Sequence, residues 1–262
     1  MKLAISNIAW DETLDLQMYD RMKQYGYSGL EIAPTRIFGE NPYKNLKKAA
    51  EWSLEFKTKY HFEIPSMQSI WYGRTETIFG SKEERDALVQ YTRLAIEFAA
   101  EIGCKNLVFG CPKNRSFPSG ADTSLAVPFF KTIGDYAAAD GVVIGLEANP
   151  VIYHTNFLND TKAALEFIKQ VDSKGLKLNL DIGTMIYNEE SILDLKGWVP
   201  YISHVHISEP YLKNIKERLL HREAKRLLEE EGYDGYVSIE MSRQESISAI
   251  FSTMRYVWRV FA

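Results

Sequence analysis

Four residues with metal-binding side chains stand at the ends of short apolar segments in the second half of the chain: Glu147, Asp181, His206 and Glu240. Three carboxylates held together would repel one another and would be costly to remove from water unless a positive charge lay among them. A divalent cation supplies that charge. The oxygen-rich donor set suits Mn²⁺, Mg²⁺ or Co²⁺, and the single imidazole also allows Zn²⁺. If the fold brings these side chains together, the sequence predicts a site for one divalent metal ion.

Eight short apolar segments, separated by segments with helical spacing, are predicted to be strands. They are Leu3–Ile5, Gly29–Ile32, Glu63–Met67, Asn106–Phe109, Val142–Glu147, Leu176–Asp181, Ile202–Ile207 and Tyr236–Glu240. Successive segments lie roughly 25 to 42 residues apart, which is the size of a unit with one strand and one crossover helix. Eight such units fill the chain without a linker. We therefore expect a single (β/α)8 TIM barrel over residues 1–262, with a doubly wound open sheet as the alternative.

The clearest predicted helix runs from Ser81 to Ile102, with a capping box of Ser81 and Glu84 at its start and Gly103 after its end. Similar spacing predicts helices at Leu14–Tyr25, Ala163–Val171 and Arg222–Glu231. An apolar stripe between Ile247 and Phe261 is expected to cover the barrel wall. The alternative use of this stripe is a contact between two copies in a homo-oligomer.

Side-chain alternation predicts which residues point into the barrel. In the fifth predicted strand Val142, Ile144 and Leu146 share one face, which leaves Gly145 and Glu147 on the other. The next three strands show the same pattern. The aliphatic face suits the helices, and the inward row at the carboxyl ends is Glu147, Asp181, His206 and Glu240, with Gly145, Asn179, His204 and Ser238 one step below. Enzymes of this architecture carry their active sites at that end of the strands.

The composition narrows the classes of partner. The chain has 31 Lys and Arg against 35 Asp and Glu, a formal charge of −4, so it offers no general attraction to nucleic acid or an anionic membrane, and we expect neither as a partner. No apolar run approaches the ~20 residues that cross a bilayer. Cys104 and Cys111 are too few for a disulfide framework and match no common zinc motif. They are interpreted as reduced thiols of a cytoplasmic protein.

Several residues just after predicted strands are candidates for binding a substrate. Trp10 would stack against the C–H face of a sugar, and the amide of Gln68 would hydrogen-bond its hydroxyls, although ordinary packing explains both equally well. Basic residues in the same kind of loop would recognise a phosphate or carboxylate, and the alternative for each is a solvated surface charge. These residues are Arg36, Arg74, Lys113, Arg115, Lys213, His221 and Arg243.

Five short pieces of the sequence resemble, in order, the xylose isomerase-like TIM-barrel superfamily. They are Gly29-Leu30-Glu31-Ile32, Gly145-Leu146-Glu147, Asn179-Leu180-Asp181-Ile182-Gly183, His204-Val205-His206-Ile207-Ser208 and Gly232 to Glu240. This superfamily includes sugar-phosphate isomerases and epimerases such as tagatose and psicose 3-epimerases, hydroxypyruvate isomerase, inosose dehydratase and, more distantly, endonuclease IV. The resemblance spans nearly the whole chain.

The resemblance implies that Glu147, Asp181, His206 and Glu240 bind one divalent metal and that the two glutamates also exchange protons with a carbohydrate substrate. The chemistry is consistent with this implication. A metal that binds a carbonyl oxygen and the neighbouring hydroxyl acidifies the adjacent C–H and stabilises the enediolate that forms. Glu147 and Glu240 would then remove a proton on one side and return it on the other, which is isomerisation or epimerisation.

Two departures from the superfamily pattern keep other functions open. Thr184 stands where a substrate-binding His is common, and no second Glu follows Glu147, where the chain continues to His154. Thr184 would still hydrogen-bond a hydroxyl, and His154 would supply acid or base chemistry. A metal-dependent dehydratase or lyase and a non-catalytic barrel are the alternatives to the isomerase. Metal-dependent DNA repair is disfavoured because it requires several metals and a basic groove.

Overall fold

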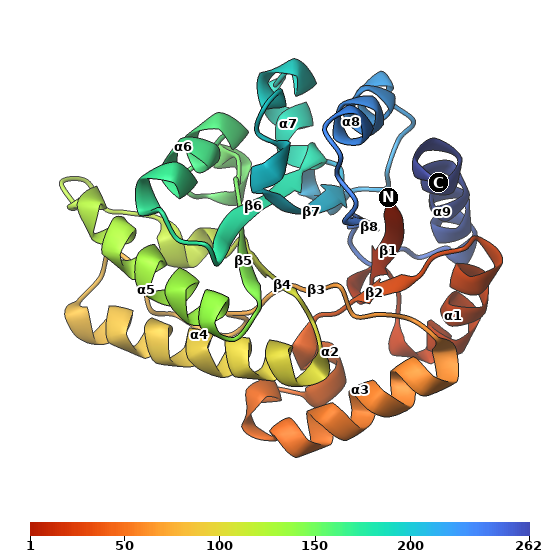
Figure 1. Cartoon of the computed structure of the whole chain (residues 1–262), viewed down its shortest axis with the longest axis horizontal. Coiled ribbons are helices and arrows are strands. Elements are labelled where there is room, and N and C mark those ends of the chain that lie inside the picture. The colour runs from red at the N-terminus through yellow and green to blue at the C-terminus, as the bar shows by residue number, and fades with distance from the viewer.

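Eight parallel strands form the centre of the protein in a computed structural model that describes residues 1–262. Figure 1 shows these strands as an inner ring with the helices around it. The strands are β1 Lys2–Ser6, β2 Gly29–Glu31, β3 Ser66–Met67, β4 Asn106–Phe109, β5 Val143–Glu147, β6 Leu176–Asp181, β7 Ile202–Ile207 and β8 Tyr236–Ile239. Their order in the sheet is β2-β1-β8-β7-β6-β5-β4-β3.

Backbone contacts between β2 and β3 bring the two ends of this sheet together. The N–H of Leu30 donates to the carbonyl oxygen of Glu63 at 2.9 Å, and the N–H of Ile32 donates to that of Ser66 at 3.2 Å. Two isolated bridges join the same segments. The ring is therefore a nearly closed (β/α)8 barrel, as the sequence predicts, and the open doubly wound sheet is excluded.

The third strand is the one that differs most from its prediction. Only Ser66 and Met67 pair with β4, whereas the sequence predicts a strand from Glu63. Pro65 explains the difference, because proline has no N–H to donate and interrupts a ladder. Glu63 retains a single bridge to Gly29. The barrel thus has its weakest pairing at the seam between β2 and β3.

Helices follow the strands and cover the outside of the ring (Figure 1). They are α1 Asp15–Gln24, α2 Pro34–Phe38, α3 Leu46–Tyr60, α4 Lys82–Ile102, α5 Ala126–Ala139, α6 Thr161–Val171, α7 Ile182–Asn188, α8 Leu219–Glu230 and α9 Ile247–Phe261. The capping box predicted for α4 is present at Ser81 and Glu84, and Gly103 ends the helix in the left-handed conformation at φ +70°. None of the helices is both long and apolar enough to span a membrane.

The two faces of the later strands differ as the alternation predicts. Leu146, Leu180, Val205 and Ile239 are fully buried in the apolar layer between strands and helices. The inward face is polar. Gly145 lies there because a Cβ at this position would come within 2.7 Å of Asn106 Oδ1 and 3.2 Å of Asn179 Cβ. The absence of a side chain at Gly145 leaves space for these asparagines under Glu147.

Gly175 fixes how closely α5 packs against the start of β6, the strand that ends in Asp181. A Cβ at Gly175 would overlap the carbonyl oxygen of Gly134 on α5. We expect Gly175→Ala to lower the free energy of unfolding by the upper part of the ~1–3 kcal/mol typical of overpacking, measured by urea denaturation.

The matched control is Gly120→Ala. Gly120 has φ +81° and open space around its Cβ position, so this variant is expected to lose only the ~1 kcal/mol of left-handed strain. Equal losses in the two variants would contradict the close packing inferred at Gly175.

Candidate metal centre

Glu147, Asp181, His206 and Glu240 converge at the carboxyl ends of β5 to β8. Each offers one ligand atom, and these atoms all lie within 4.8 Å of one another. His206 Nδ1 is 3.2 Å from Glu147 Oε2 and 3.2 Å from Glu240 Oε2. The imidazole is fully buried, whereas the three carboxyl residues are 7–8% exposed. The four predicted side chains therefore meet at the mouth of the barrel, where small molecules can reach the carboxylates.

Asp181 is held by the turn from β6 directly into α7. It is the N-cap residue of α7, and its Oδ2 accepts a hydrogen bond from the N–H of Thr184 at 2.8 Å. Thr184 Oγ1 also lies 2.8 Å from Oδ2, and the Ser208 hydroxyl donates to Oδ1. These contacts fix the direction of the carboxylate. Thr184 is fully buried behind Asp181 and is not among the residues that line the cavity at the mouth.

Glu147 is oriented by two amides. Asn149 Nδ2 donates to its Oε1 at 2.9 Å, and Asn179 Nδ2 donates to its Oε2 at 2.8 Å. Arg115 Nη1 donates to its main-chain carbonyl oxygen at 2.6 Å. The guanidinium of Arg115 is fully buried, so this residue does not extend into solvent as the sequence-based hypothesis of an anion-binding loop requires.

The second ring nitrogen of His206 contacts Glu31, which is not one of the predicted site residues. His206 Nε2 lies 3.0 Å from Oε2 of Glu31, at the end of β2. His204 Nε2 is 2.8 Å from the same oxygen, and Gln68 Nε2 donates to Oε1 at 3.1 Å. Glu31 is fully buried. An acidic residue inside a buried strand is a detectable signal, but its contact with a strand on the far side of the barrel is not visible in the sequence.

The electrostatics of the cluster indicate an excess of negative charge. Burial raises the pKa of Asp181 to about 6, and the nearby Glu147 carboxylate adds to the shift. Burial likewise raises the pKa of Glu240 to about 7. Burial disfavours the charged form of His206, but the Glu240 and Glu31 carboxylates outweigh it and hold the pKa of His206 well above its usual value. The protein without a cation thus retains protons that a divalent cation would replace, so the donor set fits such an ion.

A cavity of about 200 Å³ opens beside the three carboxylates. Gln68, Cys111, Tyr153 and Leu212 are among its other lining residues, and none of the lining residues is Lys or Arg. Gln68 is therefore the predicted substrate-binding residue that the fold brings to the cavity. Tyr153 is not among the predicted residues, because it lies six residues after the end of β5 and not directly after a strand.

The remaining predicted substrate-binding residues lie elsewhere. Trp10 is buried and donates its indole N–H to Asp15 Oδ1 at 2.7 Å, while His154 is exposed. Arg243 forms an ion pair with Asp11 at 2.6 Å on the surface, and Lys213 is exposed next to Leu212. His221 lies on α8, where its Nδ1 is 2.8 Å from the hydroxyl of Tyr256 on α9. None of these five residues lines the cavity, and His221 belongs to the helical layer.

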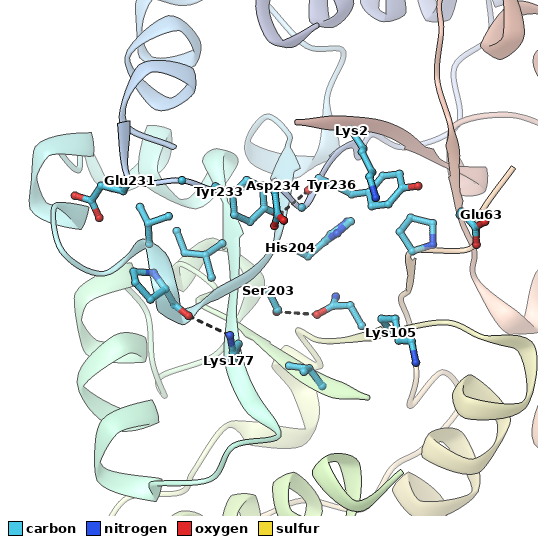
Figure 2. Close-up of a pocket in the computed structure, with 18 of the residues that line it drawn as sticks. Lys2, Glu63, Lys105, Lys177, Ser203, His204, Glu231, Tyr233, Asp234 and Tyr236 are labelled. Atoms are coloured by element: carbon cyan, nitrogen blue, oxygen red, sulfur yellow. Dashed lines mark hydrogen bonds between the residues drawn. The ribbon is translucent and has the colours of Figure 1, made fainter. Parts of the chain in front are cut away.

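A larger cavity of about 760 Å³ lies at the opposite end of the barrel (Figure 2). Lys2 and Lys177 lie near the starts of β1 and β6, Lys105 directly precedes β4, and His204 is also among the lining residues. Active sites of these barrels lie at the carboxyl ends of the strands, so the smaller cavity at the mouth is the better candidate.

Fold and donor cluster together define the class: a TIM-barrel protein with a candidate cation site at the mouth of the barrel. The chain belongs to the xylose isomerase-like TIM-barrel family, whose model matches residues 19–256. This confirms the resemblance seen in the sequence. No curated protein matches the chain.

Solved structures with the same fold include enzymes that act on sugars. The chain is similar to 3-keto-D-glucoside 4-epimerase from E. coli, with a TM-score of 0.77 and 20% identity over 99% of each chain. D-psicose 3-epimerase from Clostridium cellulolyticum H10 has a TM-score of 0.75 and 18% identity over 100% of this chain and 91% of that chain. A probable 3-DHS dehydratase from Bacillus anthracis has a TM-score of 0.71 and 16% identity over 97% of this chain and 98% of that chain. At these identities the likeness concerns the fold.

The raised pKa values predict how cation binding depends on pH. The proton on Glu240 is displaced near pH 7 and below, and that on Asp181 near pH 6 and below, and the raised pKa of His206 adds a third proton that competes with the cation. We therefore expect affinity for Mn²⁺ to rise with pH from about 5 to 8, most steeply below about 7. Isothermal titration calorimetry between these pH values measures the affinity. A constant affinity, or one that falls as the pH rises, would contradict the prediction.

Proposed function

We propose that the protein is a metal-dependent isomerase or epimerase that acts on a small carbohydrate or polyol. The observation that carries this proposal is the convergence of Glu147, Asp181, His206 and Glu240, with ligand atoms within 4.8 Å of one another, beside a cavity that the three carboxyl residues line. The similarity of fold to sugar epimerases supports it.

The four side chains would hold one divalent cation, of Mn²⁺, Mg²⁺, Co²⁺ or Zn²⁺. When bound, such an ion polarises a carbonyl group and stabilises negative charge that develops on its oxygen. Thr184, Ser208, Asn149 and Asn179 hold the carboxylates in fixed directions through the hydrogen bonds described above. Orientation set before the substrate arrives is what catalysis by electrostatic stabilisation requires.

Glu147 and Glu240 are the proposed proton-transfer residues. They extend into the cavity from β5 and from the end of β8, and two other strands, β6 and β7, separate them in the ring. One carboxylate would remove a proton from carbon on one side of the substrate, and the other would return a proton at a different position or on the opposite face. Gln68 would hydrogen-bond a substrate hydroxyl.

The cavity favours a small, uncharged substrate. Its volume of about 200 Å³ is below the ~300–1,000 Å³ of pockets that hold drug-sized ligands. Because no Lys or Arg lines it, the part of the substrate that reacts would be neutral. The anionic substrate suggested by the basic loop residues therefore has no support at the cavity itself.

Substitution of either glutamate tests the assignment. We expect Glu147→Gln and Glu240→Gln to lower kcat by at least ~10²–10⁴-fold, because each loses a proton acceptor and weakens the cation site, while circular dichroism shows the fold intact. Glu190→Gln is the control, since Glu190 is also hydrogen-bonded, to Asn188 and Thr161, but lies outside the cluster. Turnover that survives both cluster variants would refute the proton-transfer roles.

A lyase is the second candidate, favoured by the fold similarity to the probable dehydratase. The same base would remove a proton, but a neighbouring hydroxyl would then leave as water. Turnover in D₂O separates the two. For an isomerase or epimerase we expect mass spectrometry to find a product that is an isomer of the substrate and carries deuterium on carbon. A product lighter by one water would instead assign the lyase.

A further inference from the structure

We propose that Glu31 is a positioning residue for the cation site: it holds a proton on Nε2 of His206 and so directs the lone pair of Nδ1 at the cation. The inference rests on the proposed function, since it concerns the same site. It adds a residue from β2, whereas the four proposed ligands come from β5 to β8.

The two ring nitrogens of His206 face different partners. Nδ1 is 3.2 Å from both Glu147 Oε2 and Glu240 Oε2, so it points into the ligand cluster. Nε2, on the opposite side of the imidazole, is 3.0 Å from Glu31 Oε2. An ionised carboxylate only accepts hydrogen bonds, so Nε2 must carry the proton in this contact. In neutral imidazole the proton is then absent from Nδ1, which is the form that binds a metal ion.

Glu31 is itself fixed in place. Gln68 Nε2 donates to its Oε1 at 3.1 Å, and the same amide contacts Ser6 Oγ at 2.5 Å. Gln68, Ser6 and Glu31 are all buried. The carboxylate therefore cannot rotate away from His206 without breaking a buried hydrogen bond. This rigidity distinguishes Glu31 from a surface acid that happens to lie near a histidine.

His204 lines the basal cavity and also contacts Glu31. Figure 2 shows its ring among the lining residues of that cavity, and its Nε2 is 2.8 Å from Glu31 Oε2. The histidine is 1% exposed and Glu31 is fully buried, so water from the base does not reach the carboxylate. In such a dry environment the hydrogen bond between Glu31 and His206 is stronger than it would be in water.

A carboxylate on the outer nitrogen of a metal-binding histidine fixes the ring and increases its basicity. Loss of such a partner typically weakens metal binding by 10–100-fold. We therefore expect Glu31→Gln, which keeps an acceptor but removes the charge, to weaken the binding of Mn²⁺ by about 10-fold. Glu31→Met has similar volume but no acceptor, and the loss should approach about 100-fold.

The experiment measures binding and the tautomer of His206 separately. Calorimetry with Mn²⁺ on wild type, Glu31→Gln, Glu31→Met and the control Glu190→Gln gives affinity and stoichiometry. Nitrogen-15 NMR of the histidines in the Mg²⁺- or Zn²⁺-loaded protein shows which ring nitrogen carries the proton. We expect a proton on Nε2 in wild type, a mixture or the other tautomer in Glu31→Met, and unchanged binding in Glu190→Gln.

Each outcome has one meaning. If wild type binds the cation and both Glu31 variants bind it equally well with the same tautomer, the positioning role is wrong and the proposed function stands. If wild type binds no divalent cation, the proposed function fails first. If wild type binds two ions and the variants bind one, a second cation lies among Glu31, His204 and His206, and this overturns the proton-mediated role. If Glu31→Met does not fold, Glu31→Gln alone decides.

Discussion

Repulsion among buried carboxylates is the constraint on which the rest of the structure depends. Glu31, Glu147, Asp181 and Glu240 are all at least nine-tenths buried at one end of the barrel, and His206 lies among them. Charges in such a place require compensation, or they are lost by protonation. The raised pKa values of Asp181 and Glu240 indicate protonation when no cation is bound. A divalent ion would instead compensate the charges, and this is the simplest explanation of why the cluster exists.

The barrel supplies what such a cluster needs, which is rigidity beneath it. The layer below the mouth is polar: Asn179 donates a hydrogen bond to Glu147, and Asn106, whose side chain lies in the space that Gly145 leaves, donates one to Ser66. Hydrogen bonds of this kind fix directions that an apolar layer would leave free. The apolar contacts are placed on the outer face, against the helices. Strands β5 to β8 therefore stabilise the fold with one face and carry the cluster on the other.

The sequence predicts the parts of this arrangement that depend on period and order. Alternation places Glu147 and Asp181 on the inward face because successive strand residues point to opposite sides, and closure of the ring then brings their ends together. Contacts across the ring have no such signature. Glu31 is therefore not among the predicted site residues, although it lies in a predicted strand. His221 is among them, although its side chain on α8 contacts Tyr256 instead of the cavity. A position after a predicted strand is weak evidence that a residue belongs to the site, because such a residue lies either in a loop at the mouth or in the first turn of the next helix.

Thr184 illustrates how a departure from the superfamily pattern changes a role. The resemblance places a substrate-binding histidine at this position, whereas the threonine hydroxyl lies 2.8 Å from Asp181 and 2.9 Å from the carbonyl oxygen of Ala148. A side chain this short stays behind the carboxylate that it supports. The group that a histidine would present at this position is therefore absent, and Gln68 and Tyr153 are among the polar residues that line the cavity beside the carboxylates. In the proposed function, differences at this wall, more than at the cation site, would decide which carbohydrate or polyol is accepted, because a cation held by the four side chains would polarise any carbonyl with a neighbouring hydroxyl.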